Sequence, residues 1–177
     1  MKISVFGGSS PTPGSTAYIQ AFSLGRNLAL SGHTVLTGGY IGTMEAVSRG
    51  ASEAGGHVIG VTCTQIESWR QIKANSWVKE EILKASLQER LTELIENCDA
   101  CMALPGGPGT LTEIGLAWNL MIIKAIPSKP LILIGKEWIQ VITKFFESFD
   151  EYIKPSQRDL ILFANNVQQA ITLLKNT

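Results

Sequence analysis

The densest group of residues suited to chemistry lies at positions 105–113, with the sequence PGGPGTLTE. An apolar run ends at Pro105, three glycines follow, and a helical pattern then begins that carries Thr110 and Glu113. Glycine lets the backbone approach a ligand closely, and the N–H groups at a helix N-terminus favour anions. Glu113 is expected in the first helical turn, where the helix dipole favours its ionised form. We therefore predict a phosphate cradle with a carboxylate beside the group that the phosphate carries.

Two further glycine-rich junctions follow predicted strands, GGSSPTPGS at 7–15 and GGYIGT at 38–43. All three junctions contain hydroxyl side chains and none contains lysine, which suits a single phosphate such as that of a nucleoside monophosphate. The alternative is that the glycines only form tight turns. The candidate phosphate-binding residues are Gly8, Ser9, Ser10, Gly38, Gly39, Gly42, Thr43, Gly106, Gly107, Gly109 and Thr110.

Several common cofactor sites do not fit the sequence. The triphosphate loop G-x-x-x-x-G-K-[ST] and the dinucleotide spacing G-x-G-x-x-G are missing, and the second predicted strand ends in Thr37 instead of an acid. The two histidines lack zinc-ligand spacing, and Cys98 and Cys101 lie between a helix end and a strand, with Cys101 expected in the core. The lysines offer no motif for pyridoxal phosphate. We expect no cofactor and no metal.

Charge content limits the expected classes of partner, and cysteine content indicates the compartment. The chain carries 15 basic and 15 acidic residues without a block of like charge, so neither nucleic acid nor a membrane is expected as a partner. The odd number of cysteines, three, suggests free thiols in a reducing cytoplasm.

The position of the junctions depends on alternating strands and helices. Apolar runs predict strands at 2–6, 34–37, 57–61, 100–104, 130–135 and 160–163. Between them, Ser15 is expected to cap a helix that runs to Ser31, residues 62–77 to form a loop, and 78–97 a helix with a leucine stripe. Helices are also expected at 109–124 and 138–149, with Asn165 capping a last one.

This alternation indicates an α/β fold, a Rossmann-like doubly wound parallel sheet in three α/β/α layers, as a single domain over residues 1–177. In such sheets ligands bind at the carboxyl ends of the strands, where the three glycine-rich junctions fall. The helix after the third junction is apolar nearly all round, with Trp118, Leu120, Met121 and Ile122. Such a helix is either deeply buried or part of an interface, so we expect a homodimer or higher homo-oligomer.

PGGPGTLTE resembles P-G-G-x-G-T-x-x-E, the signature of the LOG ("lonely guy") family, formerly labelled lysine decarboxylases. VFGGSS at 5–10 and GGYIGTMEAVSRGASEAGGHVIGV at 38–61 resemble two other motifs of that family, so the likeness covers most of residues 3–135. It implies cleavage of the N-glycosidic bond of an adenine-type nucleoside 5′-monophosphate, giving free base and ribose 5-phosphate, without a cofactor and in dimers or larger oligomers.

The resemblance also assigns catalytic roles. Arg90 stands fifteen positions before Pro105, as the family's active-site arginine does; taken without the family, it reads as an exposed helical arginine. Glu113 would stabilise the positive charge that develops on the sugar or orient the attacking water. No proton donor to the leaving base is identified.

Other features resemble a branch of the family that includes molybdenum-cofactor carrier proteins. In the second glycine motif Thr37 and Glu45 stand where the LOG pattern has glycines, and EIGLAWN follows at 113–119. Glu45 would repel a phosphate or contact a ribose. The carriers bind a phosphorylated pterin without hydrolysing it, so the alternative function is a non-catalytic binding or carrier protein.

Overall fold

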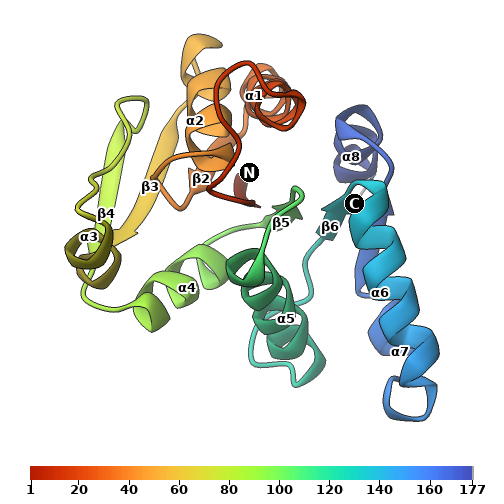
Figure 1. The fold of residues 1–177 in the computed structure, drawn as a ribbon. Coiled ribbons are helices and arrows are strands. Elements are labelled where there is room, and N and C mark those ends of the chain that lie inside the picture. The colour runs from red at the N-terminus through yellow and green to blue at the C-terminus, as the bar shows by residue number, and fades with distance from the viewer. Residues whose placement is uncertain (177) are drawn as a thin grey trace.

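The computed structural model describes residues 1–176, and its centre is a seven-stranded parallel sheet of order β4-β3-β2-β1-β5-β6-β7 (Figure 1). The strands are β1 (Lys2–Phe6), β2 (Thr34–Thr37), β3 (Val58–Cys63), β4 (Glu80–Lys84), β5 (Ala100–Ala103), β6 (Leu131–Ile134) and β7 (Ile161–Ala164). The chain runs outward from β1 to β4 and then returns to the other side of β1. This reversal between β1 and β5 is the switch point at which such sheets bind ligands.

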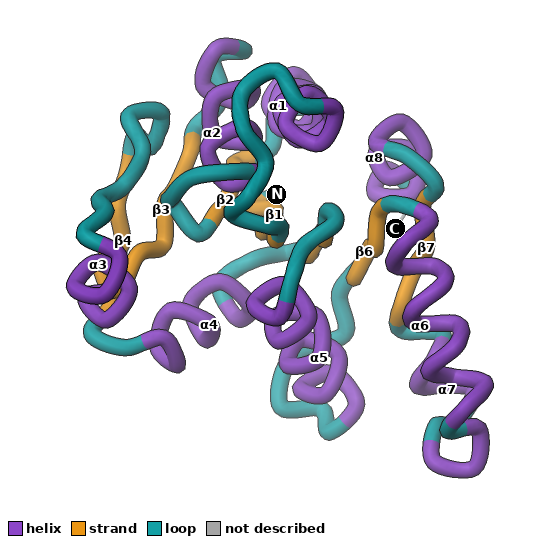
Figure 2. The backbone as a smooth tube through the Cα atoms, viewed as in Figure 1, coloured by secondary structure: helices purple, strands orange, loops and turns teal. Residues whose placement is uncertain are grey.

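Helices cover both faces of the sheet, as Figure 2 shows. They are α1 (Thr16–Leu30), α2 (Thr43–Glu53), α3 (Thr64–Arg70), α4 (Leu87–Glu96), α5 (Pro108–Ile122), α6 (Lys136–Ser148), α7 (Pro155–Arg158) and α8 (Val167–Lys175), with a 3-10 turn at Asp150–Tyr152. Side chains of α1, α2 and α8 pack with Ile3 and Val5 on one face. Those of α4, α5 and α6 pack with Phe6 and Leu36 on the other. The predicted three-layer α/β/α architecture is confirmed.

The local signals for helix starts and core residues were mostly sound. The Ser15 side chain accepts a hydrogen bond from the Tyr18 N–H at 3.3 Å and caps α1 as predicted. The last helix is instead capped by Asn166, one residue later than predicted, whose side chain accepts from the Gln169 N–H at 2.9 Å. Cys101 is buried in the core, as expected, and the three cysteines are free.

The helix predicted over 78–97 is wrong in its first half. Glu80–Lys84 forms the edge strand β4 because it pairs in parallel with β3, a contact that no local pattern reveals. A new helix then starts where the Ser86 hydroxyl accepts from the Glu89 N–H at 3.2 Å. Leu83, part of the predicted leucine stripe, is exposed on the edge strand, while Leu91 and Leu94 lie on the buried face of α4.

The loop predicted over 62–77 is also wrong in part. The third strand continues to Cys63, whose backbone N–H donates to the Tyr40 hydroxyl at 2.8 Å, and α3 follows at once. Seven residues are too few to show a helical period, which explains the failure of the prediction. Because α3 follows the carboxyl end of β3, it stands beside the glycine-rich junctions. Within residues 1–176, no helix is long and apolar enough to cross a membrane.

Candidate functional site

The three glycine-rich junctions meet at the carboxyl edge of the sheet. The Gly8 N–H donates to the carbonyl oxygen of Pro105 at 3.2 Å, which ties the first junction to the third. The Thr43 N–H and hydroxyl both donate to the carbonyl oxygen of Gly8, at 3.0 and 2.8 Å, which ties the second junction to the first. The predicted convergence is thus present, and part of its hydrogen-bonding capacity holds the junctions to one another.

Close packing within the protein explains why two of these positions are glycine, with no need to invoke a ligand. Gly42 has a φ of +74°, and a Cβ atom there would lie 2.5 Å from the carbonyl carbon of Ser9. A Cβ atom on Gly106 would lie 2.2 Å from Oγ1 of Thr110, which is buried. Any larger residue would push the junctions apart, so these glycines allow the close packing of the junctions that form the site.

Arg90 is buried beneath the second junction, with 5% of its surface exposed. Its Nε donates to the carbonyl oxygen of Val61 at 2.7 Å and its Nη2 to that of Gly38 at 3.1 Å. The guanidinium also lies 5.6 Å from the centre of the Tyr40 ring. These contacts hold the cation in one orientation. The reading of Arg90 as an exposed helical arginine is therefore wrong.

Glu113 is also buried, with 8% of its surface exposed. It is the sixth residue of α5, which begins at Pro108, so it lies beyond the first turn where it was predicted. Burial raises the pKa of its carboxyl to about 7, and the nearby Arg90 charge only partly opposes this effect. The expected preference for the ionised form is therefore reversed by desolvation.

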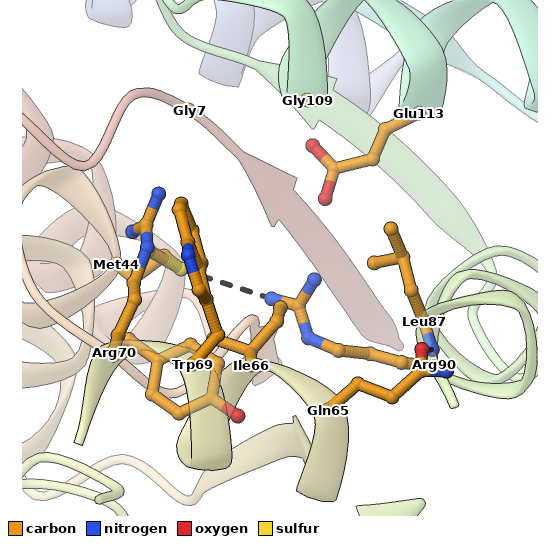
Figure 3. Close-up of a pocket in the computed structure, with 11 residues that line it drawn as sticks. Gly7, Met44, Gln65, Ile66, Trp69, Arg70, Leu87, Arg90, Gly109 and Glu113 are labelled. Atoms are coloured by element: carbon orange, nitrogen blue, oxygen red, sulfur yellow. Dashed lines mark hydrogen bonds between the residues drawn. The ribbon is translucent and has the colours of Figure 1, made fainter. Parts of the chain in front are cut away.

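A cavity of about 420 Å³ brings Arg90 and Glu113 together (Figure 3). The two side chains point into it from different helices, Glu113 from α5 and Arg90 from α4. No ion pair joins them among the ion pairs of the described chain. The cavity is lined by Gly7, Tyr40, Met44, Gln65, Ile66, Trp69, Arg70, Leu87, Arg90, Gly109 and Glu113. A buried acid and a buried cation thus face one space that also reaches the first and third junctions.

Other predicted residues lie around this cavity or away from it. The Ser9 hydroxyl accepts a hydrogen bond from Arg70 at 3.4 Å, and Gly107 is the residue before the first turn of α5. The backbone groups of Gly39 already form hydrogen bonds within the protein: its N–H donates to the Thr37 hydroxyl, and its carbonyl oxygen accepts from Asn75. Ser10 is exposed. The ligand roles of these residues stay predictions.

Glu45 does not line the cavity. One of its carboxylate oxygens accepts a hydrogen bond from the Tyr18 hydroxyl at 3.3 Å, which directs it toward α1. This interaction offers a structural explanation for the acid at a position where the LOG pattern has glycine.

Sequence reasoning missed one wall of the cavity. Gln65, Ile66, Trp69 and Arg70 all come from α3, a segment that was predicted as a loop. The two tryptophans within residues 62–77, Trp69 and Trp77, were a signal of a buried or binding role there, and Trp69 lines the cavity.

A larger cavity of about 630 Å³ lies on the other side of Pro105, near the starts of α1, α6 and α8. Its lining includes Lys136 and Glu137 but neither Arg90 nor Glu113. The smaller cavity is lined by the buried side chains of Arg90 and Glu113 and is therefore the better candidate site. Within residues 1–176, no group of three His, Cys, Asp or Glu side chains could hold a metal ion.

Comparison with known proteins identifies the family of the chain and its fold. The profile of the SLOG cluster4 family matches residues 1–170. The cytokinin riboside 5′-monophosphate phosphoribohydrolase LOG5 of Arabidopsis thaliana is 34% identical over 146 residues, which is 80% of this chain and 62% of LOG5. The chain therefore spans less than two thirds of that relative's length.

Solved structures show the same fold. The molybdenum cofactor binding protein of Rippkaea orientalis has a TM-score of 0.77 and 28% identity, covering 99% of this chain and 95% of that one. The molybdenum cofactor carrier protein of Chlamydomonas reinhardtii has a TM-score of 0.74 and 29% identity, covering 99% and 96%. The resemblance to the LOG family is confirmed, and the chain belongs to its SLOG cluster4 family.

Proposed function

We propose that the protein is a phosphoribohydrolase that cleaves an adenine-type nucleoside 5′-monophosphate into free base and ribose 5-phosphate. The observation that carries the proposal is that Arg90 and Glu113, from two different helices, both point into one cavity that reaches Gly7 and Gly109. LOG5, the relative at 34% identity, bears the name of that activity. The phosphate would lie at the junctions and the ribose between the two charged side chains.

Glu113 would act on the sugar and on the attacking water. As the C1′–N bond breaks, its electron pair leaves with the base and positive charge develops on the sugar. An ionised Glu113 stabilises that charge and accepts a proton from the water that adds to C1′, while the departing base takes up a proton from the solvent. With a pKa of about 7, this carboxyl both loses and regains a proton near neutral pH. Glu113 is the only carboxylic acid among the described residues that line the cavity.

Arg90 would orient the ribose. Its Nε and Nη2 are held by backbone carbonyls, while Nη1 forms no hydrogen bond to any residue within 1–176. A fixed guanidinium with a free donor is suited to hold a ribose oxygen without a large entropic cost. Ile66, Trp69 and Leu87 form an apolar wall for the leaving base.

The assay is incubation of purified protein with AMP and related monophosphates, followed by chromatographic detection of free base. Glu113→Gln and Arg90→Ala should each abolish base release and leave the fold intact. The exposed Glu96 and Arg26 provide matched controls, because Glu96→Gln and Arg26→Ala change the same side chains away from the cavity. Full turnover in the Glu113 or Arg90 variant would remove the proposed roles.

The second candidate is a carrier or binding protein for a phosphorylated ligand such as the molybdenum cofactor. It is favoured by the structures from Rippkaea orientalis and Chlamydomonas reinhardtii, which align over 99% of this chain. The departures at Thr37 and Glu45 also favour it. Tighter binding of a molybdopterin than of AMP, without release of base from any monophosphate, would support the carrier.

We further propose a single-domain, cytoplasmic protein that forms a homodimer or higher oligomer. Three free cysteines support the reducing compartment. The oligomer is proposed because of α5, the helix predicted to be buried or to form an interface. This helix buries Ile114 and Met121 in the core, while its Leu111 is 49% exposed and available for a contact with another subunit. A monomeric mass in light scattering at micromolar concentration would contradict the oligomer.

A further inference from the structure

Two arginines line the cavity, and their surroundings differ. Arg90 is buried, and two of its nitrogens are committed to backbone carbonyls. Arg70, the last residue of α3, is exposed and stands on the cavity wall opposite α5 (Figure 3). Only the second arginine is therefore able to give most of its donors to a ligand.

The contacts of Arg70 place its charge at the first junction. Its Nη1 donates to the Ser9 hydroxyl at 3.4 Å, a long hydrogen bond, and its guanidinium lies 4.9 Å from the centre of the Trp69 ring. Arg70 makes no ion pair with any residue in the described part of the chain. Stacking on Trp69 steadies the guanidinium, while its charge is left without a counterion.

Part of the donor capacity of the junctions is already used within the protein. The Gly8 and Thr43 N–H groups already bond to neighbouring junctions. The N–H groups of Gly109 and Thr110 in the first turn of α5 lack intrahelical partners and carry only partial positive charge. Lysine is absent from the described lining of the cavity. Arg70 is the exposed residue of the described lining that carries a full positive charge, and it is placed to pair with a phosphomonoester bound here.

We infer that Arg70 binds the phosphate of the ligand and is the residue by which this site distinguishes a phosphomonoester from its unphosphorylated form. The inference rests on the proposed function in so far as the same cavity holds the phosphorylated ligand. The guanidinium exchanges its weak contact with Ser9 for a paired, charge-assisted contact with phosphate oxygens. The short helix α3 thereby joins the three glycine-rich junctions as a fourth part of the phosphate site.

The test compares ribose 5-phosphate with adenosine as probes, using calorimetry on the full chain. Arg70→Gln should weaken binding of ribose 5-phosphate about tenfold or more and leave adenosine binding unchanged, because only the charged contact is lost. Arg70→Lys should restore most of the affinity. The matched control Arg26→Gln removes an exposed arginine of α1 and should change neither affinity. Added salt should weaken wild-type binding of ribose 5-phosphate more than that of Arg70→Gln.

Three outcomes would overturn the inference: unchanged binding of ribose 5-phosphate in Arg70→Gln, an equal loss for adenosine, or no binding of ribose 5-phosphate by the wild type. Arg70→Lys covers the case in which Arg70→Gln does not fold. Because the readout is binding, it is independent of turnover. If the wild type releases no base and Arg70→Gln binds ribose 5-phosphate more weakly than the wild type, the proposed hydrolase activity is refuted and the inference about Arg70 is supported.

Discussion

The guanidinium of Arg90 and the backbone of Gly38 occupy adjoining space, such that a Cβ atom on Gly38 would lie 1.8 Å from Nη2 of Arg90. The same nitrogen donates to the Gly38 carbonyl oxygen at 3.1 Å. Gly38 was predicted as a phosphate-binding residue, and the structure gives it another role: it makes room for the buried arginine and anchors it.

Gly38→Ala should therefore displace Arg90 and abolish base release. Overpacking of this kind costs about 1–3 kcal/mol of stability, so the variant should remain folded but melt earlier. The measurement is base release from AMP together with thermal unfolding. Gly115→Ala is the control, because nothing lies near the added methyl and alanine favours a helix. Normal activity in Gly38→Ala would show that the position of Arg90 is not critical.

The raised pKa of Glu113 predicts a pH-dependent stability. Between its ordinary value of 4.5 and about 7, the folded protein holds a proton that the unfolded chain has lost. The free energy of unfolding should therefore fall as the pH rises through this window, by about 2 kcal/mol between pH 5 and pH 8. Urea unfolding of wild type and Glu113→Gln at both pH values measures this. The variant should lack that loss, whereas Glu96→Gln should retain it; identical pH dependence in all three would contradict the buried acid.

The same carboxyl predicts the pH profile of the reaction. If ionised Glu113 accepts the proton of water, kcat/KM should fall on the acid side with a midpoint near 7. The second ionisation of a phosphate monoester has a pKa of about 6, so the two limbs are separable. Base release measured from pH 5.5 to 8.5 would show this, and a profile without a limb near 7 would exclude that role for Glu113.

Tyr40 should matter for stability. Its hydroxyl accepts from the Cys63 N–H at 2.8 Å and donates to the Cys63 carbonyl at 3.2 Å, at the point where β3 passes into α3. Tyr40→Phe leaves both buried backbone groups without this partner and should cost about 1–3 kcal/mol. Urea unfolding measures the loss. Tyr152→Phe, at an 80% exposed position, should have little effect. Equal stabilities of the two variants would mean that water replaces the hydroxyl.

Much of the site was accessible from the sequence because it is built from local signals. An apolar run, the glycines of PGGPGT and a helical pattern follow one another in the sequence, and they form β5 and α5 close to their expected bounds. The match of Arg90 and Glu113 to a family pattern predicted a shared site, and both residues line one cavity. The wall made by Trp69 and Arg70 was missed, because α3 is short and its position follows from β3 and Tyr40.

The sequence by itself determined the alternation of apolar strands with helices and the three flexible junctions, since each depends on residues adjacent in the chain. Only the tertiary structure decided that Glu80–Lys84 joins the sheet edge, because strand pairing is a contact between distant segments. It also decided the chemistry of the two charged residues. Glu113 holds its proton to about pH 7 because packing removes water from it, and Arg90 is fixed by the carbonyl oxygen of Val61 in β3 and by that of Gly38, just after β2.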